Sequence, residues 1–196
     1  MKFKLPASNF ELTPAGIHAA RIARIVYLGT QPPLSDKPSK WNKDPKPQRK
    51  LRIFFELPGA LVAVGDEKKP AWTLADINFS TGQRATLTKL RKAVGVSTEG
   101  DDLDFDDLLG RPLTLTVVHK KGNDGKIYAN TDTESFAGLP AFAAQSLPDI
   151  VGDSFCFNLE EPNEALIEKL GPGTIKKLSY YIVRAYPLFQ ILKLLG

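Results

Sequence analysis

The side chains able to carry out catalysis are few and widely spaced. The chain has two histidines, His18 and His119, and one cysteine, Cys156. A single cysteine excludes an internal disulfide framework and a cysteine-rich zinc site. Its place between two phenylalanines is typical of a small buried apolar residue. We interpret both histidines as ordinary structural residues, because His119 ends a predicted strand and His18 has no catalytic partner beside it.

One acidic cluster resembles a metal site at first sight. It comprises Asp101, Asp102, Asp104, Asp106 and Asp107. The spacing of a calcium-binding EF-hand is absent, because no glycine stands at the sixth loop position and no glutamate at the twelfth. The chain also lacks a phosphate-binding P-loop and a Gly-x-Ser-x-Gly nucleophile motif. We therefore interpret the cluster as a solvated acidic surface, and expect a protein that is not an enzyme and holds no metal or cofactor.

The charges are strongly segregated along the chain, although the net charge is only +4 over 196 residues. Residues 1–52 carry eleven Lys or Arg against three acids. Residues 97–110 and 127–168 carry six and eight acids and no base, whereas residues 169–196 carry five bases and no acid. This pattern favours a basic surface for a polyanion, balanced by acidic surface elsewhere. The alternative is chance clustering on solvated faces.

The basic segments also contain aromatic residues. Proteins that bind single strands combine a cationic groove with aromatic rings on which bases stack, at roughly 1–3 kcal/mol per base. Trp41, Phe54, Trp72 and Tyr128 are the candidate stacking residues, with Trp72 favoured as a core residue instead. The alternatives are that Trp41 docks on the body of the protein and that a C-terminal helix covers Phe54. The candidate phosphate contacts are Lys37, Lys40, Lys43, Lys46, Arg49, Lys50, Arg52, Lys120, Lys121 and Lys126.

Hydrophobic patterning predicts the elements that carry these residues. We expect five strands, over residues 16–29, 49–57, 72–79, 112–119 and 127–133. In the second of them, alternate residues from Leu51 to Leu57 belong to a core, and Lys50, Arg52 and Phe54 face the other way. A helix is predicted over 84–94, starting near residues 80–82 and stopping at Gly95. The acidic residues 97–110 are expected to end in a short helix or turn.

The connections differ in length and composition. Residues 30–48 hold five prolines and predict a long basic loop. Residues 58–71 predict a second loop, and residues 120–126 a tight hairpin turn with Asn123 to Gly125 at its tip. Residues 137–153 are predicted to form a loop. Helices are predicted over 164–170 and 174–195, with an interruption at 171–173.

This order of elements predicts a mainly β fold with added helices. Five strands with a helix between the third and fourth are typical of an OB-fold barrel, whose ligands bind strands 2–3 and the loops between strands 1–2 and 4–5. Here those loops are the basic segments 30–48 and 120–126. Another small β-barrel or a sandwich would give the same order. We expect a ligand-binding domain over 1–140 and a C-terminal helical extension over 141–196.

Several short motifs together resemble a known family. They include Gly16-Ile-His-x-Ala-Arg21, Tyr27-Leu-Gly-Thr-Gln31, Arg49-Lys-x-Arg-Ile-x-Phe-Glu-Leu57, Leu108-Leu-Gly-Arg-Pro112 and Gly125-Lys-x-Tyr-Ala-Asn130. The chain resembles the OB-fold single-stranded-DNA-binding proteins of tailed-bacteriophage replication and recombination modules. The resemblance implies non-catalytic DNA binding in the cytoplasm of an infected bacterium, with phage or host replication proteins as partners. It also implies Arg21 as a further residue on the DNA side.

Two other hypotheses remain open from the sequence. One is a phage structural or assembly protein that forms a homo-oligomer through its apolar C-terminal helix. The other is an RNA-binding or inhibitor module on the same barrel. Because the sequence has no apolar run of about 18 residues and no signal peptide at its start, we expect a cytoplasmic protein without a membrane partner.

Overall fold

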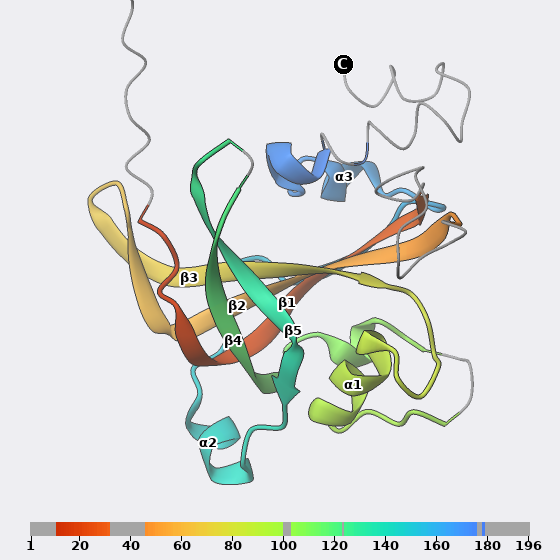
Figure 1. Cartoon of the computed structure of the whole chain (residues 1–196), viewed down its shortest axis with the longest axis horizontal. Helices are drawn as coiled ribbons and strands as arrows, with labels where there is room; N and C mark the ends of the chain where they lie inside the picture. Colours follow the sequence, from red (N-terminus) through yellow and green to blue (C-terminus); the bar gives the residue numbers. More distant parts are fainter. Residues whose placement is uncertain (1–10, 32–45, 100–102, 123, 176–177, 179–196) are drawn as a thin grey trace, which may run out of the picture.

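A curved, mainly antiparallel β-sheet forms the centre of the described structure (Figure 1). The computed structural model describes residues 11–31, 46–99, 103–122, 124–175 and 178. Five strands follow the order β3-β2-β1-β4-β5, and a sixth strand, β6, pairs with β1. Their bounds are β1 Gly16–Gln31, β2 Gln48–Val64, β3 Glu67–Asn78, β4 Pro112–Lys121, β5 Ile127–Ala137 and β6 Phe155–Asn158. The prediction of a mainly β fold with added helices is confirmed.

Strand β1 organises the sheet because it pairs with three partners. Its first residues, Gly16–Arg21, lie antiparallel to β4. Residues Arg24–Tyr27 on the same strand lie parallel to β6, with an irregularity in the β1–β2 ladder between Ile22 and Arg24. Strand β2 runs along β1 from Arg21 to Gln31. The C-terminal extension therefore contributes a strand to the same sheet as the predicted N-terminal domain.

The two outer strands, β3 and β5, come close together as the sheet curls. The hydroxyl groups of Thr73 on β3 and Thr131 on β5 are hydrogen-bonded at 2.8 Å. Within the described part of the chain no ladder of backbone bonds joins β3 to β5, so the sheet is not closed. Helix α1, Thr86–Ala93, lies between β3 and β4 in sequence.

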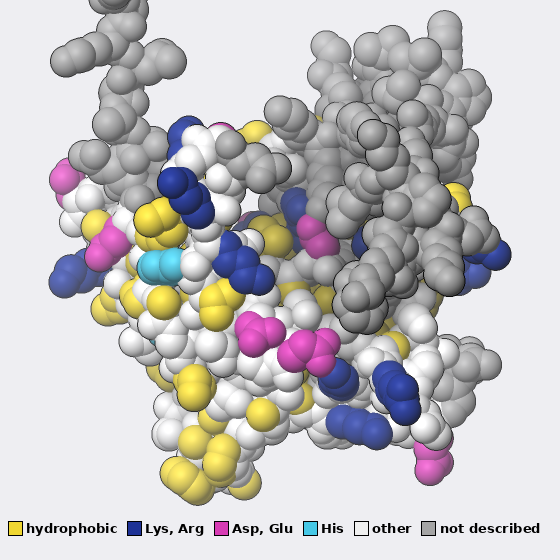
Figure 2. All heavy atoms as spheres, viewed as in Figure 1, with side chains coloured by type: hydrophobic (Ala, Val, Ile, Leu, Met, Phe, Trp, Pro, Cys, Tyr) yellow, Lys and Arg dark blue, Asp and Glu magenta, His cyan; other side chains and the backbone are white. Residues whose placement is uncertain are grey.

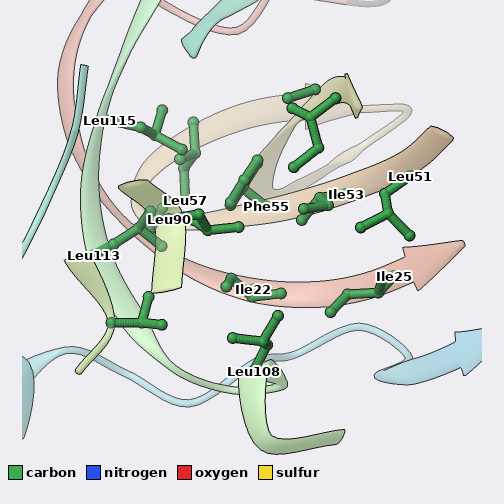
Figure 3. Packing of buried hydrophobic residues seen from close by; sticks show 14 of the residues in the cluster. Ile22, Ile25, Leu51, Ile53, Phe55, Leu57, Leu90, Leu108, Leu113 and Leu115 are labelled. Carbon is green, nitrogen blue, oxygen red and sulfur yellow. The ribbon is translucent and has the colours of Figure 1, made fainter. Parts of the chain in front are cut away.

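The main core fills the inside of this curve. Leucine, isoleucine and phenylalanine side chains from β1, β2, β4, α1 and the short 3-10 helix Asp106–Leu108 converge there (Figure 3). Phe55 is fully buried at the centre of β2, where its ring lies 5.5 Å from that of Phe136 on β5. The alternation predicted for residues 51–57 is confirmed, because all four apolar residues on that face are completely buried: Leu51, Ile53, Phe55 and Leu57.

A second apolar cluster joins the extension to the opposite face of the sheet. Val26 and Leu28 of β1 are fully buried against Phe155 and Phe157 of β6. The short helices of the extension are α2, Ala141–Ser146, and α3, Glu164–Ile167. Leu166 and Ile167 of α3 pack on this second cluster. No helix among the described residues is long and apolar enough to cross a membrane.

The expected loop over residues 58–71 is wrong. Strands β2 and β3 continue through it as a two-stranded arm, with Leu61 paired to Pro70 and Val64 to Glu67. Gly65 turns the chain at the tip with a φ of +64°, a conformation that glycine adopts without steric cost. Pro70 suggested a loop because it lacks a backbone donor, but a proline can stand in a strand where that donor is not required.

The extension also differs from the prediction in several places. Residues 137–153, expected as loop, contain α2, and β6 was not predicted. The helix predicted over 164–170 ends at Ile167, and Pro172 and Gly173 lie in the first turn of the next helical segment rather than in a break. Proline is favoured in a first helical turn because its missing donor is not needed there.

Helix α1 confirms the prediction for 84–94 and its stop at Gly95, which has a φ of +72°. Its start differs, because the residue before the helix is Ala85 and no side chain caps it. Instead, the Thr88 hydroxyl donates a hydrogen bond to the carbonyl of Gly82. The predicted short helix in the acidic segment is confirmed at Asp106–Leu108.

Candidate functional site

The turn between β4 and β5 brings together four of the residues predicted to contact DNA. Lys120 pairs across the strands with Tyr128, and Lys121 pairs with Ile127. Lys120, Lys121 and Lys126 are all exposed. In the described part of the chain none of these three lysines forms an ion pair. Their charges are therefore directed to solvent.

Tyr128 is fixed at the same turn by a contact that the sequence did not predict. Its hydroxyl donates a hydrogen bond to Oδ2 of Asp124 at 2.7 Å, and Oδ1 of Asp124 accepts one from the backbone N–H of Lys126 at 3.1 Å. These bonds lower the pKa of the Asp124 carboxyl and raise the pKa of Tyr128. The Tyr128 side chain remains 46% exposed. A motif of Asp four residues before Tyr could have indicated this pair.

Figure 2 shows basic side chains gathered over the β4–β5 hairpin and in a second group near α1, with acidic side chains between the two groups. Lys89 and Lys92 belong to α1, and Arg84 precedes it by two residues. Lys89 forms an ion pair with Glu134 of β5. Lys89 of the α1 group is thus paired with an acid, and in the hairpin the charge of Lys126 contributes to the lowered pKa of Asp124.

The other predicted loop is only partly covered by the structure. Lys37, Lys40, Trp41 and Lys43 lie outside the described residues, so they remain predictions. Lys46 and Arg49 are exposed at the base of this loop, and Lys50 is half-buried. Arg49 and Lys50 stand at the start of β2, where Arg49 pairs with Thr30 near the end of β1.

Arg21 forms hydrogen bonds with backbone carbonyls of the protein itself. Its guanidinium donates hydrogen bonds to three backbone carbonyls, those of Gly110, Leu147 and Pro148, at 2.7–2.8 Å. Its side chain is 14% exposed and also lies 3.5 Å from Asp149. The role that the structure supports for Arg21 is to hold the start of the C-terminal extension on the sheet, so we do not retain it as a DNA contact.

Arg52 and Phe54 also face the extension instead of solvent. Arg52 forms a bidentate ion pair with Asp76 of β3, at 2.8 and 3.0 Å, and donates a hydrogen bond to the Thr174 hydroxyl at 3.4 Å. Phe54 packs against the second apolar cluster. The alternative in which C-terminal residues cover this face therefore describes Phe54 better than stacking does, and both residues are left out of the proposal below.

The clamp that holds the extension was missed by sequence reasoning. The Glu56 carboxylate is completely buried and accepts hydrogen bonds from the backbone N–H groups of Val151 and Gly152, at 2.8 and 3.0 Å. The Arg24 guanidinium lies 4.8 Å from the centre of the Trp72 ring and donates to the carbonyl of Asp153. Because these hydrogen bonds go to backbone atoms of residues 151–153, they require no particular side chains there, and the sequence gives no sign of them.

The two histidines form hydrogen bonds with backbone carbonyls, and the cysteine is partly buried. His119 donates from Nε2 to the carbonyl of Thr13, and His18 to that of Pro14. Burial raises the pKa of the Cys156 thiol, and a hydrogen bond to Asp106 adds to this effect. Among the described residues no group of His, Cys, Asp or Glu side chains could hold a metal ion; Asp101 and Asp102 lie outside them.

No family model, curated protein or solved structure matches this chain. Its function must therefore be inferred from its own residues and geometry.

Proposed function

We propose that this chain is a sequence-tolerant, non-catalytic single-stranded-DNA-binding protein of phage replication or recombination. The observation that carries the proposal is the β4–β5 turn, where three exposed lysines without ion pairs among the described residues lie on the same hairpin as a half-exposed tyrosine, and Lys120 pairs across the strands with it. Exposed cations bind phosphates by releasing condensed counterions. An aromatic ring among them adds an affinity for bases that is independent of sequence.

The strand order supports an OB-like arrangement. In the order β3-β2-β1-β4-β5 a barrel would close between β3 and β5, and these strands approach each other at Thr73 and Thr131. A helix lies between the third and fourth strands, as in that fold. The β4–β5 turn is then one of the two loops that flank the ligand in OB-folds.

The C-terminal extension changes where a strand could lie. The outward face of β1 and β2 carries Arg21, Arg52 and Phe54, and all three contact the extension. In Figure 1, α3 stands beside that face. The proposed DNA path therefore follows the β4–β5 turn and the exposed base of the 30–48 loop, at Arg49, instead of the middle of the sheet.

Removal of the positive charges on the hairpin tests the proposal. The variant with Lys120→Gln, Lys121→Gln and Lys126→Gln should bind oligo-dT more weakly than the unaltered chain. Each lost phosphate contact should flatten the slope of log affinity against log salt by about 0.7. The matched control, with Arg84→Gln, Lys89→Gln and Lys92→Gln near α1, removes the same charge and should leave the slope nearly unchanged. Equal effects of the two variants would mean that only the overall charge matters, and the hairpin site would be wrong.

A further inference from the structure

The tip of the β4–β5 hairpin presents an aromatic ring in a fixed orientation. The Tyr128 hydroxyl is held by Asp124 at 2.7 Å, so rotation of the side chain away from the turn breaks a hydrogen bond. The ring edge lies directly over Gly122. A methyl group placed on Gly122 would come within 2.7 Å of Cε2 of Tyr128 and 2.8 Å of Oδ1 of Asp124. Glycine is thus required for this close approach.

The contacts of the hydroxyl and the ring leave much of the side chain open. Nearly half of the Tyr128 surface, 46%, remains exposed. An exposed aromatic ring is usually mobile, and immobilising it on binding costs entropy. Here the chain has already fixed the ring, and it is flanked by Lys120 across the strands and by Lys126 two residues earlier. An exposed ring with lysines nearby on the same hairpin fits a planar, uncharged ring attached to a phosphate backbone.

We propose that Tyr128 is a stacking residue for an unpaired nucleobase, and that Asp124 and Gly122 are the residues that position it. This inference rests on the proposed function and adds the two residues that fix the orientation of the stacking ring. A base in a duplex is covered on both faces by its neighbours, so it cannot stack on Tyr128 without leaving the helix. The hairpin lysines would supply affinity for any phosphate backbone, and Tyr128 the preference for accessible bases.

The test compares two single strands with identical backbone charge. Oligo-dT and an abasic oligonucleotide of the same length are titrated with the full chain at fixed low salt. The unaltered protein should bind oligo-dT about ten-fold more tightly than the abasic strand, since one stacked base contributes roughly 1–3 kcal/mol. Tyr128→Ala should bind both strands equally, with an unchanged salt slope. The lysine variant described above should instead weaken binding to both strands alike.

A second pair of variants isolates the positioning role. Asp124→Asn and Asp124→Ala remove the same charge, but only the asparagine retains an oxygen that can accept a bond from the tyrosine hydroxyl. Asp124→Ala should therefore bind oligo-dT about three-fold more weakly than Asp124→Asn, while the two bind the abasic strand equally. Gly122→Ala should reduce the preference for oligo-dT over the abasic strand by displacing the ring.

The two proposals fail in different ways. If the unaltered protein binds oligo-dT and Tyr128→Ala keeps the same preference over the abasic strand, the stacking role is wrong and the proposed function stands. If the unaltered protein binds neither strand at low salt, the proposed function is wrong and the stacking role with it. If Asp124→Ala and Asp124→Asn bind both strands alike, Asp124 does not position the ring.

Discussion

Arg21 and Lys126 carry the same charge, yet their surroundings separate a structural cation from an exposed one. The Arg21 guanidinium meets three carbonyl oxygens, and its planar set of donors suits such a cluster. Lys126 is exposed and makes no ion pair with any residue that the structure describes. Sequence alone assigns both to the same basic surface, because a backbone carbonyl from residue 147 or 148 leaves no signal near residue 21.

Arg21→Ala should therefore change stability rather than DNA affinity. Removing the guanidinium leaves carbonyls of residues 110, 147 and 148 without their donor, and we expect the free energy of unfolding to fall by about 2–3 kcal/mol. Urea denaturation measures the loss. The control Lys126→Ala should stay within about 0.5 kcal/mol of the unaltered chain. Equal stability of the two variants would contradict the role of Arg21 in holding the start of the C-terminal extension on the sheet.

Cys156 gives a second test at the same scale. Its pKa is raised, first by burial and then by the hydrogen bond and negative charge of Asp106, so the reactive thiolate forms only at more alkaline pH. A thiol reagent should label the native protein slowly at neutral pH and the unfolded protein rapidly. Asp106→Asn removes the negative charge, lowers the pKa and should accelerate labelling of the native protein. Rapid labelling of the unaltered native protein at neutral pH would contradict this account.

Among the elements, the segment 147–153 depends on a close contact with the sheet. A methyl group on Gly152 would lie 2.5 Å from Cζ2 of Trp72 and 3.2 Å from Oε2 of Glu56. Gly152→Ala should therefore destabilise the protein by about 1–3 kcal/mol, because the segment must move away from its clamp. Hydrogen exchange at the amides of Val151 and residue 152, which donate to Glu56, should accelerate.

The control for this substitution is Gly59→Ala, since a methyl group on Gly59 meets nothing within 4 Å. Gly59→Ala should leave the exchange of the Val151 amide unchanged. If Gly152→Ala leaves exchange and stability as they are, the clamp on this segment does not contribute as the contacts suggest.

Local patterns predicted those elements whose signal lies within a few residues. The alternation from Leu51 to Leu57 placed four side chains correctly in the core, and the glycines near residue 123 predicted the β4–β5 turn. The arm over 58–71 was missed because its prolines and glycines resemble those of a loop. Strand β6 was missed because it has only four residues and pairs with β1, far away in the sequence.

Only part of the candidate site could be predicted from the sequence. The hairpin lysines and Tyr128 were found because they adjoin a recognisable turn. Their separation from Arg21, Arg52 and Phe54 depends on which face the extension covers, and that follows from tertiary contacts with Leu147, Thr174 and the second apolar cluster. Charge counts along the chain do not contain this information.

At the scale of the whole molecule, the described residues of the extension pack directly on the sheet. Val26 and Leu28 of β1 are fully buried by residues beyond 150, and the buried Glu56 carboxylate takes its donors from residues 151 and 152. Exposed basic residues outside this packing lie at the β4–β5 turn, and Glu134, farther along β5, pairs with Lys89 of α1. The net charge of +4 is thus the small difference between surfaces of opposite sign.

The most direct test of DNA binding is a fluorescence-anisotropy titration of labelled oligo-dT with the full chain at increasing salt. The proposed function predicts binding at low salt that weakens as salt rises. If the three hairpin lysines contact phosphates, log affinity should fall with log salt with a slope of about −2 or steeper. Absence of binding at low salt, or binding whose affinity does not change with salt, would contradict it.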